Sequence, residues 1–481
     1  MRGAKLFMTL LSIGATACGC APEIAGEPAC GELRGTPPRE PVPVVIIVND
    51  AQRRDRAGVY GGHARTPAFD GFARANLLFL RAFSQAPWTR PSVATLFTGL
   101  SPSQHGVGLE ERTDPPTARA LAGELTTLAE VLQAAGYRTA AFVANPWMSR
   151  RFGFEQGFDA YNYSDQWEFP GEAISEEALQ WLATVPPDQP FFLYLHFLDS
   201  HRPYPALPME EIEAHQERVA ADPRRELSAQ AKEELRALVR VEGTDPEAAA
   251  RVEPSVTLLE MAYERGIEDF DRALARFLDG FERRRAADRA VVIVTSDHGE
   301  AFYTRGYGNH GQGLYDDELA IPLAARLPGI SGPPGGVSCQ VGLVDLMPTL
   351  CSYLGMTCPA QLAGRSLIDV SPSAPRFLVA EAVGSQPRHR AIRGQRYKLI
   401  YEPGNPPDGA RADPYRLYDI VADPEERSEL LASGDARSRE IAERMRAILL
   451  APPPPGPRLS ERLVPFEDDT EERLRALGYV P

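Results

Sequence analysis

The sequence is short of positive charge. Its 51 lysine and arginine residues are outnumbered by 66 aspartate and glutamate residues, which gives a formal net charge of −15 over 481 residues. A surface with this balance repels the phosphate backbone of DNA and RNA, so nucleic-acid binding is not expected. Small anionic substrates are not excluded, because a bound metal ion can reverse the field locally.

Apolar segments long enough to cross a bilayer are also missing. The run from Leu6 to Ala17 is apolar but too short to span a membrane, and Arg2 and Lys5 precede it. A positive start followed by a short apolar run is typical of an export signal that is removed from the mature protein. We therefore expect an exported protein.

Small residues lead from this run to Cys18, with Cys20 close behind, which resembles a bacterial lipoprotein signal. An ordinary secretory signal is the alternative. We expect a signal or lipoprotein segment over residues 1–20 and a tether rich in Gly, Pro and charge over 21–42. The protein would then lie in the periplasm or at the cell surface, attached to the membrane through an N-terminal lipid anchor.

Cysteine is scarce as well, with six residues in the whole chain. None has the spacing of zinc ligands, so cysteine is not expected to carry the chemistry. Export permits disulfides, and Cys351 with Cys358 is the expected local pair.

Short apolar runs alternate with amphipathic segments along the chain. The clearest amphipathic segment extends from Leu259 to Phe281, with apolar residues at helical spacing. Buried strands that alternate with helices predict an α/β fold with a mostly parallel sheet flanked by helices. The predicted strands are 44–48, 139–143, 191–195 and 291–294.

Composition divides the chain further. We expect a catalytic α/β domain over 43–375, interrupted by a charged, alanine-rich helical insertion at 206–254. Alternating runs predict a small C-terminal antiparallel subdomain over 376–450. Residues 451–481 form a Pro-rich linker and tail in this division.

Polar residues follow each predicted strand. Parallel strands deliver their carboxyl ends to one edge of the sheet, where open α/β folds bind ligands. One aspartate in such a position is often a helix cap, but four polar strand ends are not explained as caps. The residues in question are Asp50, Asn145, His196, Asp199, His201, Asp297 and His298.

A separate element supplies a hydroxyl group. Pro91 fits the first turn of a helix, which places Thr89 at or near the helix N-terminus. Exposed amides and the helix dipole favour an alkoxide and a bound oxyanion there. The alternative is that Thr89 only caps the helix.

Several motifs follow one another in a fixed order over about residues 43–430. They are Val48-Asn49-Asp50, Ala82 to Thr89 with Pro91-Ser92, Leu96 to Leu100, Leu195 to Asp199 with His201, Thr295 to Glu300, Asn309-His310-Gly311, Ile321-Pro322-Leu323, Tyr397 to Tyr401 and Leu417 to Asp419. Together they resemble the sulfatase family of the alkaline phosphatase superfamily.

The resemblance implies a fold like that of alkaline phosphatase and one divalent cation, Mn²⁺, Ca²⁺, Mg²⁺ or Zn²⁺. Carried over by position, the metal ligands are Asp50, Thr89, Asp297 and His298, with Thr89 also the nucleophile. The same comparison assigns His201 and His310 to the charged ester group or the leaving oxygen; each could instead be a polar residue behind the site. Carboxylates suit hard cations, and an imidazole favours Mn²⁺ or Zn²⁺.

Several positions depart from the family pattern. Sulfatases have Cys or Ser at the position of Thr89, which is oxidised to formylglycine, and threonine cannot give that aldehyde hydrate. Val93 replaces an arginine, Ala51 replaces a second aspartate, and Gln312 stands where many relatives have lysine. The resulting site is similar to those of lipoteichoic acid synthases, phosphoethanolamine transferases and phosphonate monoester hydrolases.

We therefore expect Thr89 to attack a phosphate ester, with sulfate a less favoured substrate. The substrate would be a small molecule or a glycan or lipid ester. Two other functions remain open: a transferase of a phosphoryl-linked group at the cell envelope, and a catalytically silent, lipid-anchored binding protein.

The remaining polar residues have weaker signals. The two-residue alternation of a strand predicts that His196 faces away from the site, as a supporting or core histidine. Asn145 is left open. His105 and Asp345 are expected to be structural.

Overall fold

The computed structural model describes residues 33–108, 117–164, 170–215, 232–233, 235, 238, 241–242, 255–284, 287–368, 376–382, 389–403, 413–451 and 456–465. The predicted signal segment, most of the tether and much of the 206–254 insertion lie outside these residues. Among the described helices, none has the length and apolar character needed to cross a membrane.

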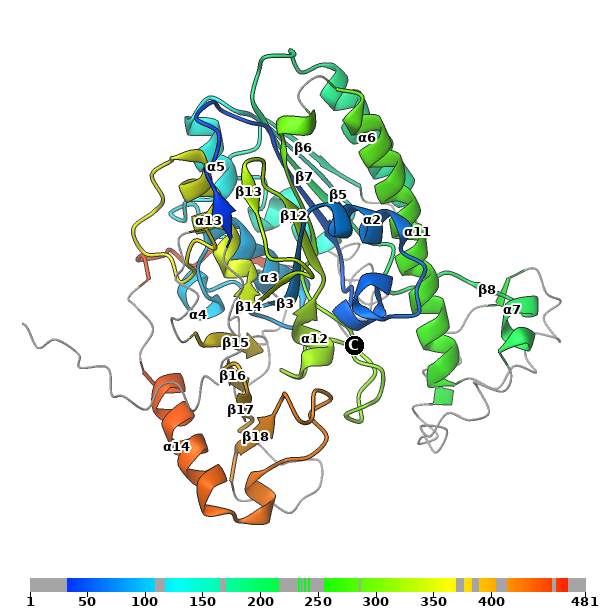
Figure 1. Cartoon of the computed structure of the whole chain (residues 1–481), viewed down its shortest axis with the longest axis vertical. Helices are drawn as coiled ribbons and strands as arrows, with labels where there is room; N and C mark the ends of the chain where they lie inside the picture. The colour runs from blue at the N-terminus through cyan, green and yellow to red at the C-terminus, as the bar shows by residue number, and fades with distance from the viewer. Residues whose placement is uncertain are drawn as a thin grey trace, which may run out of the picture.

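A central nine-stranded sheet organises the main domain (Figure 1). Five neighbouring strands run parallel in the order β10-β2-β7-β5-β6, and all four predicted strands are among them. The mostly parallel sheet is therefore confirmed. These strands are β2 (Val44–Asn49), β5 (Arg138–Val143), β6 (Ala160–Tyr163), β7 (Phe191–Phe197) and β10 (Val291–Ser296).

The other side of the sheet contains antiparallel pairs. β12 pairs antiparallel with β10 and with β3, while β14 runs parallel to β3. The strands here are β3 (Leu77–Phe83), β11 (Ala320–Ile321), β12 (Leu323–Arg326) and β14 (Val337–Gly342).

Helices cover both faces of the sheet (Figure 1). In β2, Val44, Ile46 and Val48 pack on one face, whereas Val45 and Ile47 pack on the other, which explains the continuous apolar run. The first face is covered by α3 (Thr89–Thr98), α5 (Leu128–Ala134) and α13 (Leu346–Leu354). The second is covered by α2 (Pro67–Ala75), α6 (Gly171–Ala183) and α11 (Val256–Glu282).

The predicted C-terminal antiparallel sheet is present as β15-β16-β17-β18. Ile441, Met445 and Leu449 of one helix pack against it. The elements are β15 (Leu378–Ala382), β16 (His389–Arg393), β17 (Tyr397–Tyr401), β18 (Tyr415–Asp419) and α14 (Ala436–Leu449).

The chain then returns to the main domain. β19 (Leu463–Pro465) pairs antiparallel with β4 (Thr117–Arg119), so the segment after the C-terminal subdomain contributes a strand to the main domain.

The predicted Cys351–Cys358 disulfide is present. Shorter elements are β1 (Arg34–Gly35) with β13 (Ile330–Ser331), β8 (Leu207–Pro208) with β9 (Val241–Glu242), α4 (Pro102–His105), α7 (Met209–Ala214) and α12 (Asp316–Leu319).

Candidate active site

Asp50 is the centre of a buried polar cluster. β2 ends at Asn49 and delivers Asp50, which is fully buried, to the carboxyl edge of the sheet. Its Oδ2 lies 2.9 Å from His196 Nε2, 2.5 Å from Asn145 Nδ2 and 3.4 Å from Thr89 Oγ1. Four elements that are distant in sequence therefore meet at one carboxylate.

β10 brings the second carboxylate. Ser296 pairs with Asn49 in the parallel register, so the next residue, Asp297, emerges beside Asp50. His298 Nε2 lies 3.5 Å from Asp50 Oδ1, 3.6 Å from Asp297 Oδ2 and 3.4 Å from Thr89 Oγ1. The structure thus gathers Asp50, Thr89, Asp297 and His298, the predicted metal ligands.

The cluster fits a divalent cation. Within the described part of the chain, Asp50 Oδ1 and Asp297 Oδ2 are buried without a hydrogen-bond donor. Burial and the neighbouring Asp50 raise the pKa of Asp297 well above its ordinary value. Two adjacent buried carboxylates are costly unless a cation neutralises them.

The donor set matches this interpretation. Ligand atoms of Asp50, His196 and Asp297 all lie within 4.8 Å of one another. His298 Nδ1 lies 2.7 Å from the Gly299 carbonyl, a contact that places the ring proton on Nδ1 and leaves Nε2 to act as a ligand. Carboxylate oxygens with imidazole nitrogen suit Mn²⁺ or Zn²⁺ and accept Mg²⁺ or Ca²⁺.

The prediction that His196 faces away from the site is wrong. β7 ends at Phe197 and the chain turns before His201, so the alternation cannot be counted across that turn. Within the sheet, His196 pairs with Val48, whose side chain lies on the face covered by α3, and His196 lies on that same face. Tyr194 Oη, 2.8 Å from Nδ1, orients the ring toward Asp50.

A group of imidazoles lies over this cluster. The His310 ring centroid is 4.5 Å from that of His298 and 5.0 Å from that of His201. Burial lowers the pKa of His298 to about 3 and the pKa of His201 to about 4, so both are neutral at pH 7. His310 Nδ1 lies 3.2 Å from Glu300 Oε2, which turns Nε2 away from that carboxylate.

Glu300 was not singled out as a site residue from the sequence. Burial acts to raise its pKa, but His310 and Arg202 outweigh burial and hold the pKa at about 2. The carboxylate is therefore ionised and can stabilise a protonated His310, as in a catalytic dyad. The sequence signal was its place directly after Asp297-His298-Gly299.

Thr89 is the first residue of α3 and is fully buried. Asn145, which the sequence left open, belongs to the cluster because its Nδ2 also lies 3.3 Å from Thr89 Oγ1. The next residue, Arg90, stacks on Trp147 with 4.8 Å between the guanidinium carbon and the ring centroid. This contact joins the start of α3 to the segment that carries Asn145.

Three other polar residues from strand ends and motifs make contacts outside the cluster around Asp50. His105 Nε2 lies 3.1 Å from Thr95 Oγ1, and Asp345 forms a buried ion pair with Arg376. Asp199 accepts a hydrogen bond from the Gly171 amide at the start of α6, at 3.1 Å, so its carboxylate is turned toward that helix.

Asp199 gives a test by pH. Burial raises the pKa of Asp199 from 3.8 to about 7, so the folded state prefers the protonated carboxyl. The protonated carboxyl makes its full contribution to the free energy of unfolding at low pH, and this contribution is lost as the pH rises from about 4 to 7. Asp199→Asn should stabilise the protein by on the order of 2 kcal/mol at pH 8 and by almost nothing at pH 4. Urea unfolding at both pH values measures this; equal effects at both would contradict it.

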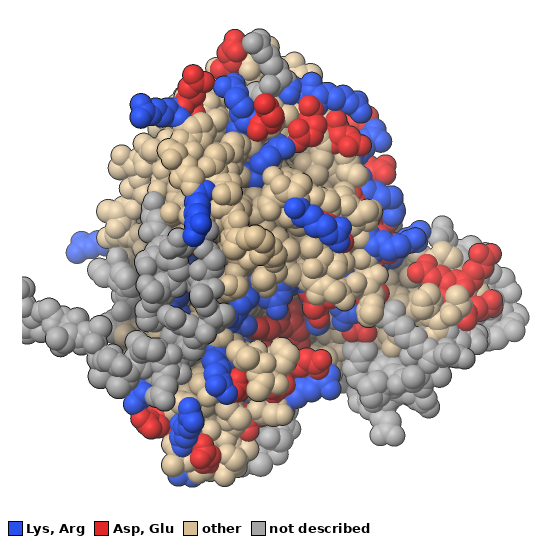
Figure 2. All heavy atoms as spheres, viewed as in Figure 1, with Lys and Arg blue, Asp and Glu red and all other residues tan. Residues whose placement is uncertain are grey.

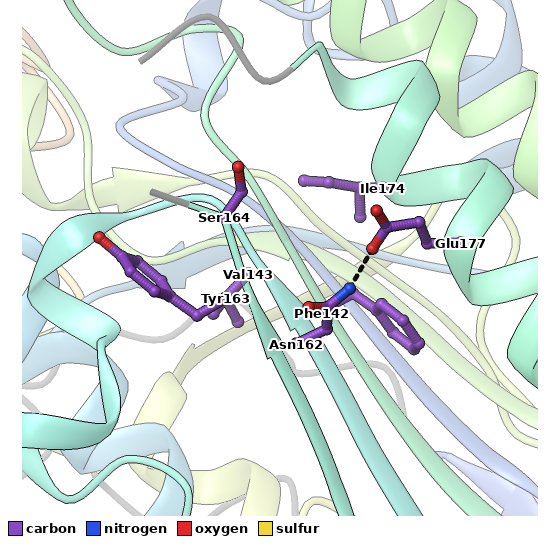
Figure 3. Close-up of a pocket in the computed structure, with 7 residues that line it drawn as sticks. All are labelled: Phe142, Val143, Asn162, Tyr163, Ser164, Ile174 and Glu177. Atoms are coloured by element: carbon purple, nitrogen blue, oxygen red, sulfur yellow. Dashed lines mark hydrogen bonds between the residues drawn. The ribbon is translucent and has the colours of Figure 1, made fainter. Parts of the chain in front are cut away.

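A small cavity of about 190 Å³ lies at the ends of β5 and β6 (Figure 3). Its lining contains one carboxylate, Glu177, hydrogen-bonded to Asn162, and no imidazole. The cavity therefore lacks the acid–base groups found around Asp50. Its other lining residues are Phe142, Val143, Tyr163, Ser164 and Ile174.

A buried hydroxyl, paired carboxylates and clustered imidazoles thus lie together around a possible metal site. The sulfatase family model matches residues 43–356, more than half of the chain, and the protein belongs to the sulfatase family. It is 24% identical over 434 residues to a Δ4,5-hexuronate-2-O-sulfatase of Bacteroides thetaiotaomicron, covering 84% of this chain and 87% of that protein.

Solved structures share the fold. A protein in complex with its substrate D-glucosamine-2-N,6-O-disulfate superposes with a TM-score of 0.67 at 17% identity, covering 91% of this chain and 98% of that one. The phosphonate monoester hydrolase of Agrobacterium radiobacter superposes with a TM-score of 0.63 at 21% identity, covering 86% and 95%.

Proposed function

We propose that this chain is an exported, metal-dependent hydrolase of phosphate esters, with phosphodiesters preferred and Thr89 as the nucleophile. The observation that carries the proposal is the position of the Thr89 hydroxyl, 3.4 Å from both Asp50 Oδ2 and His298 Nε2 at the N-terminus of α3. A hydroxyl in that position is poised for deprotonation and attack.

The reaction has two halves. Thr89 enters as the alkoxide, its hydroxyl proton having passed to solvent. Its Oγ1 attacks phosphorus, the bond from phosphorus to the leaving oxygen breaks, and a protonated imidazole gives that oxygen its proton. Water then attacks the phosphothreonine, the same imidazole takes one proton from the water, and Thr89 leaves again as the alkoxide. A divalent cation held by Asp50, Thr89, Asp297 and His298 would lower the pKa of the hydroxyl and neutralise developing charge.

We assign the acid–base role to His310, because Glu300 is placed to stabilise its protonated form. His201, neutral and fully buried nearby, would contact the ester. His196 would donate to Asp50 and fix the orientation of that carboxylate.

The choice of phosphate over sulfate rests on Thr89. A formylglycine hydrate can expel sulfate by elimination, whereas a modified threonine has to be attacked by water or another acceptor. The choice of diester over monoester rests on charge: Val93 and Gln312 replace cationic positions of the family, and fewer cations favour a monoanionic substrate. Relatives named for sulfated sugars support a sugar-linked ester among the candidates.

The proposal is tested by assays on an aryl sulfate, an aryl phosphate monoester and an aryl phosphodiester. The protein is first stripped of metal, and Mn²⁺, Zn²⁺, Mg²⁺ or Ca²⁺ is then added back. We expect phosphodiester turnover to exceed sulfate turnover by at least about tenfold, and to require the added ion. Faster sulfate turnover would overturn the preference. Absence of all three activities would favour a transferase that needs its own acceptor, or a binding protein.

The cellular location is part of the proposal. The lipoprotein-like segment that ends at Cys18 or Cys20 supports export and attachment to a membrane by a lipid. Labelling with a fatty-acid analogue, with and without Cys18→Ser and Cys20→Ser, would identify the modified cysteine; no labelling of the unaltered chain would exclude the anchor.

A further inference from the structure

The short helix α12, Asp316–Leu319, lies between the main sheet and the C-terminal subdomain (Figure 1). It has no role in the reaction described above. Its side chains nevertheless contact two other segments. One is the loop that carries His310, and the other is the pair of strands β16 and β17 of the subdomain.

Glu318 is the contact to the catalytic loop, and it is fully buried. Its Oε2 accepts hydrogen bonds from the amides of Gly311 at 2.7 Å and Gln312 at 3.3 Å. Its Oε1 accepts from the amide of Gly313 at 2.9 Å and from Tyr307 Oη at 2.6 Å. The segment from Tyr307 to Gly313 is thus folded around a single carboxylate, and His310 is inside that segment.

The backbone of the same helix binds the segment that carries Glu300, the carboxylate beside His310 Nδ1. The Gly299 amide donates to the Glu318 carbonyl at 2.8 Å, and the Glu300 amide donates to the Asp317 carbonyl at 3.0 Å. Glu300 in turn contacts His310 Nδ1. Both the loop of His310 and the carboxylate that orients its ring are therefore fixed by α12.

Asp316 anchors this helix to the subdomain. Its Oδ1 lies 2.8 Å from Lys398 Nζ and its Oδ2 lies 2.6 Å from Arg393 Nη2, while Lys398 also pairs with Glu426 at 2.7 Å. Lys398 is fully buried, and Glu426 Oε2 accepts from the Asp316 amide at 2.7 Å. Figure 2 shows charged side chains of both signs gathered in the hollow between the two parts of the molecule.

We propose that Glu318 is a positioning residue for His310, and that α12 is the element through which the C-terminal subdomain keeps the acid–base group in place. The inference rests on the proposed role of His310. Burial raises the pKa of Glu318 well above its ordinary value, but four donors converge on its two oxygens, and the ionised carboxylate accepts from all four with no proton of its own to place. A glutamine has one amide nitrogen, which would face either the Gly313 and Tyr307 donors or the Gly311 and Gln312 donors.

The proposal is tested by comparing the rates for phosphodiesters that have different leaving groups. Alkyl phosphodiesters need a proton on the leaving oxygen, whereas 4-nitrophenyl esters barely do. Glu318→Gln should lower kcat about 100-fold for an alkyl diester and less than about fivefold for the nitrophenyl diester, with little change in KM. Asp271→Asn is the matched control, because Asp271 is also a buried carboxylate that accepts from backbone amides, those of Ala68 and Phe69 in α2; both of its rates should stay near those of the unaltered protein.

A double-mutant cycle separates positioning from general damage. His310→Ala alone should reproduce the leaving-group dependence, and adding Glu318→Gln to it should cost little more. Equal losses on both substrates, or additive losses in the cycle, would overturn the proposal. A His310→Ala protein with full activity would instead show that the proposed function is wrong at His310.

Tyr307→Phe serves if Glu318→Gln fails to fold. It removes one of the four donors to Glu318 and leaves the carboxylate in place. We expect the same dependence on the leaving group at reduced size, and unchanged rates on both substrates would contradict the proposal.

Discussion

Replacing Thr89 by valine should abolish turnover, by at least about 10³-fold in kcat, while the protein stays folded. Valine keeps the shape of threonine and lacks the attacking oxygen. Thr89→Ser should retain part of the activity, because it keeps the hydroxyl and loses a methyl group. Thr95→Val, on the same helix, removes a hydroxyl that contacts His105 and should leave turnover unchanged.

Mass spectrometry gives this prediction a second measurement. Acid quenching during turnover of a phosphodiester should trap a phosphorylated peptide that contains Thr89, and the Thr89→Val protein should give none. Turnover by the Thr89→Val protein would show that Thr89 is only the first residue of a helix. Trapping of the peptide without product release would identify a transferase that lacks its acceptor.

Asp297→Asn should weaken metal binding by at least about 100-fold, and activity should fall with it. Asp297 and Asp50 are adjacent and fully buried, so their mutual repulsion is relieved either by a bound cation or by removal of one charge. With a chelator present, we therefore expect Asp297→Asn to unfold at a higher temperature than the unaltered protein. Added Mn²⁺ should raise the melting temperature of the unaltered protein only.

Thermal unfolding with and without chelator measures this effect independently of any substrate. Asp199→Asn is the matched control, because it neutralises another buried carboxylate whose hydrogen bond is to α6. Its response to Mn²⁺ should equal that of the unaltered protein. If Asp297→Asn responds to Mn²⁺ as strongly as the unaltered protein, Asp297 is not a metal ligand.

The sequence predicts the parallel core well because its strands are buried on both faces and appear as unbroken apolar runs. It also predicts that Asp50 and Asp297 meet, since parallel neighbouring strands deliver their ends together. It fails at His196, because β7 ends at Phe197 and the alternation of a strand does not relate its side chains to residues after the turn. The parity of a strand holds only within its hydrogen-bonded register.

The contacts of α12 were beyond the reach of sequence patterns. Glu318 lies in a four-residue helix, too short to give a periodic signal, and its acceptor role depends on a loop that folds around it. Lys398 is in an alternating strand and would ordinarily be assigned to the surface, yet it is fully buried between Asp316 and Glu426. Buried ion pairs between distant segments leave no mark in local composition.

The pairing of β19 with β4 has a further consequence. The C-terminal subdomain follows α13 of the main domain and precedes β19, which is again part of the main domain, so the main domain holds it at both ends. A subdomain held at both ends stays at a high effective concentration near its docking surface. When the ion pair between Lys398 and Asp316 opens, it should therefore close again quickly. Cutting the chain before β19 should prolong the time for which this ion pair stays open.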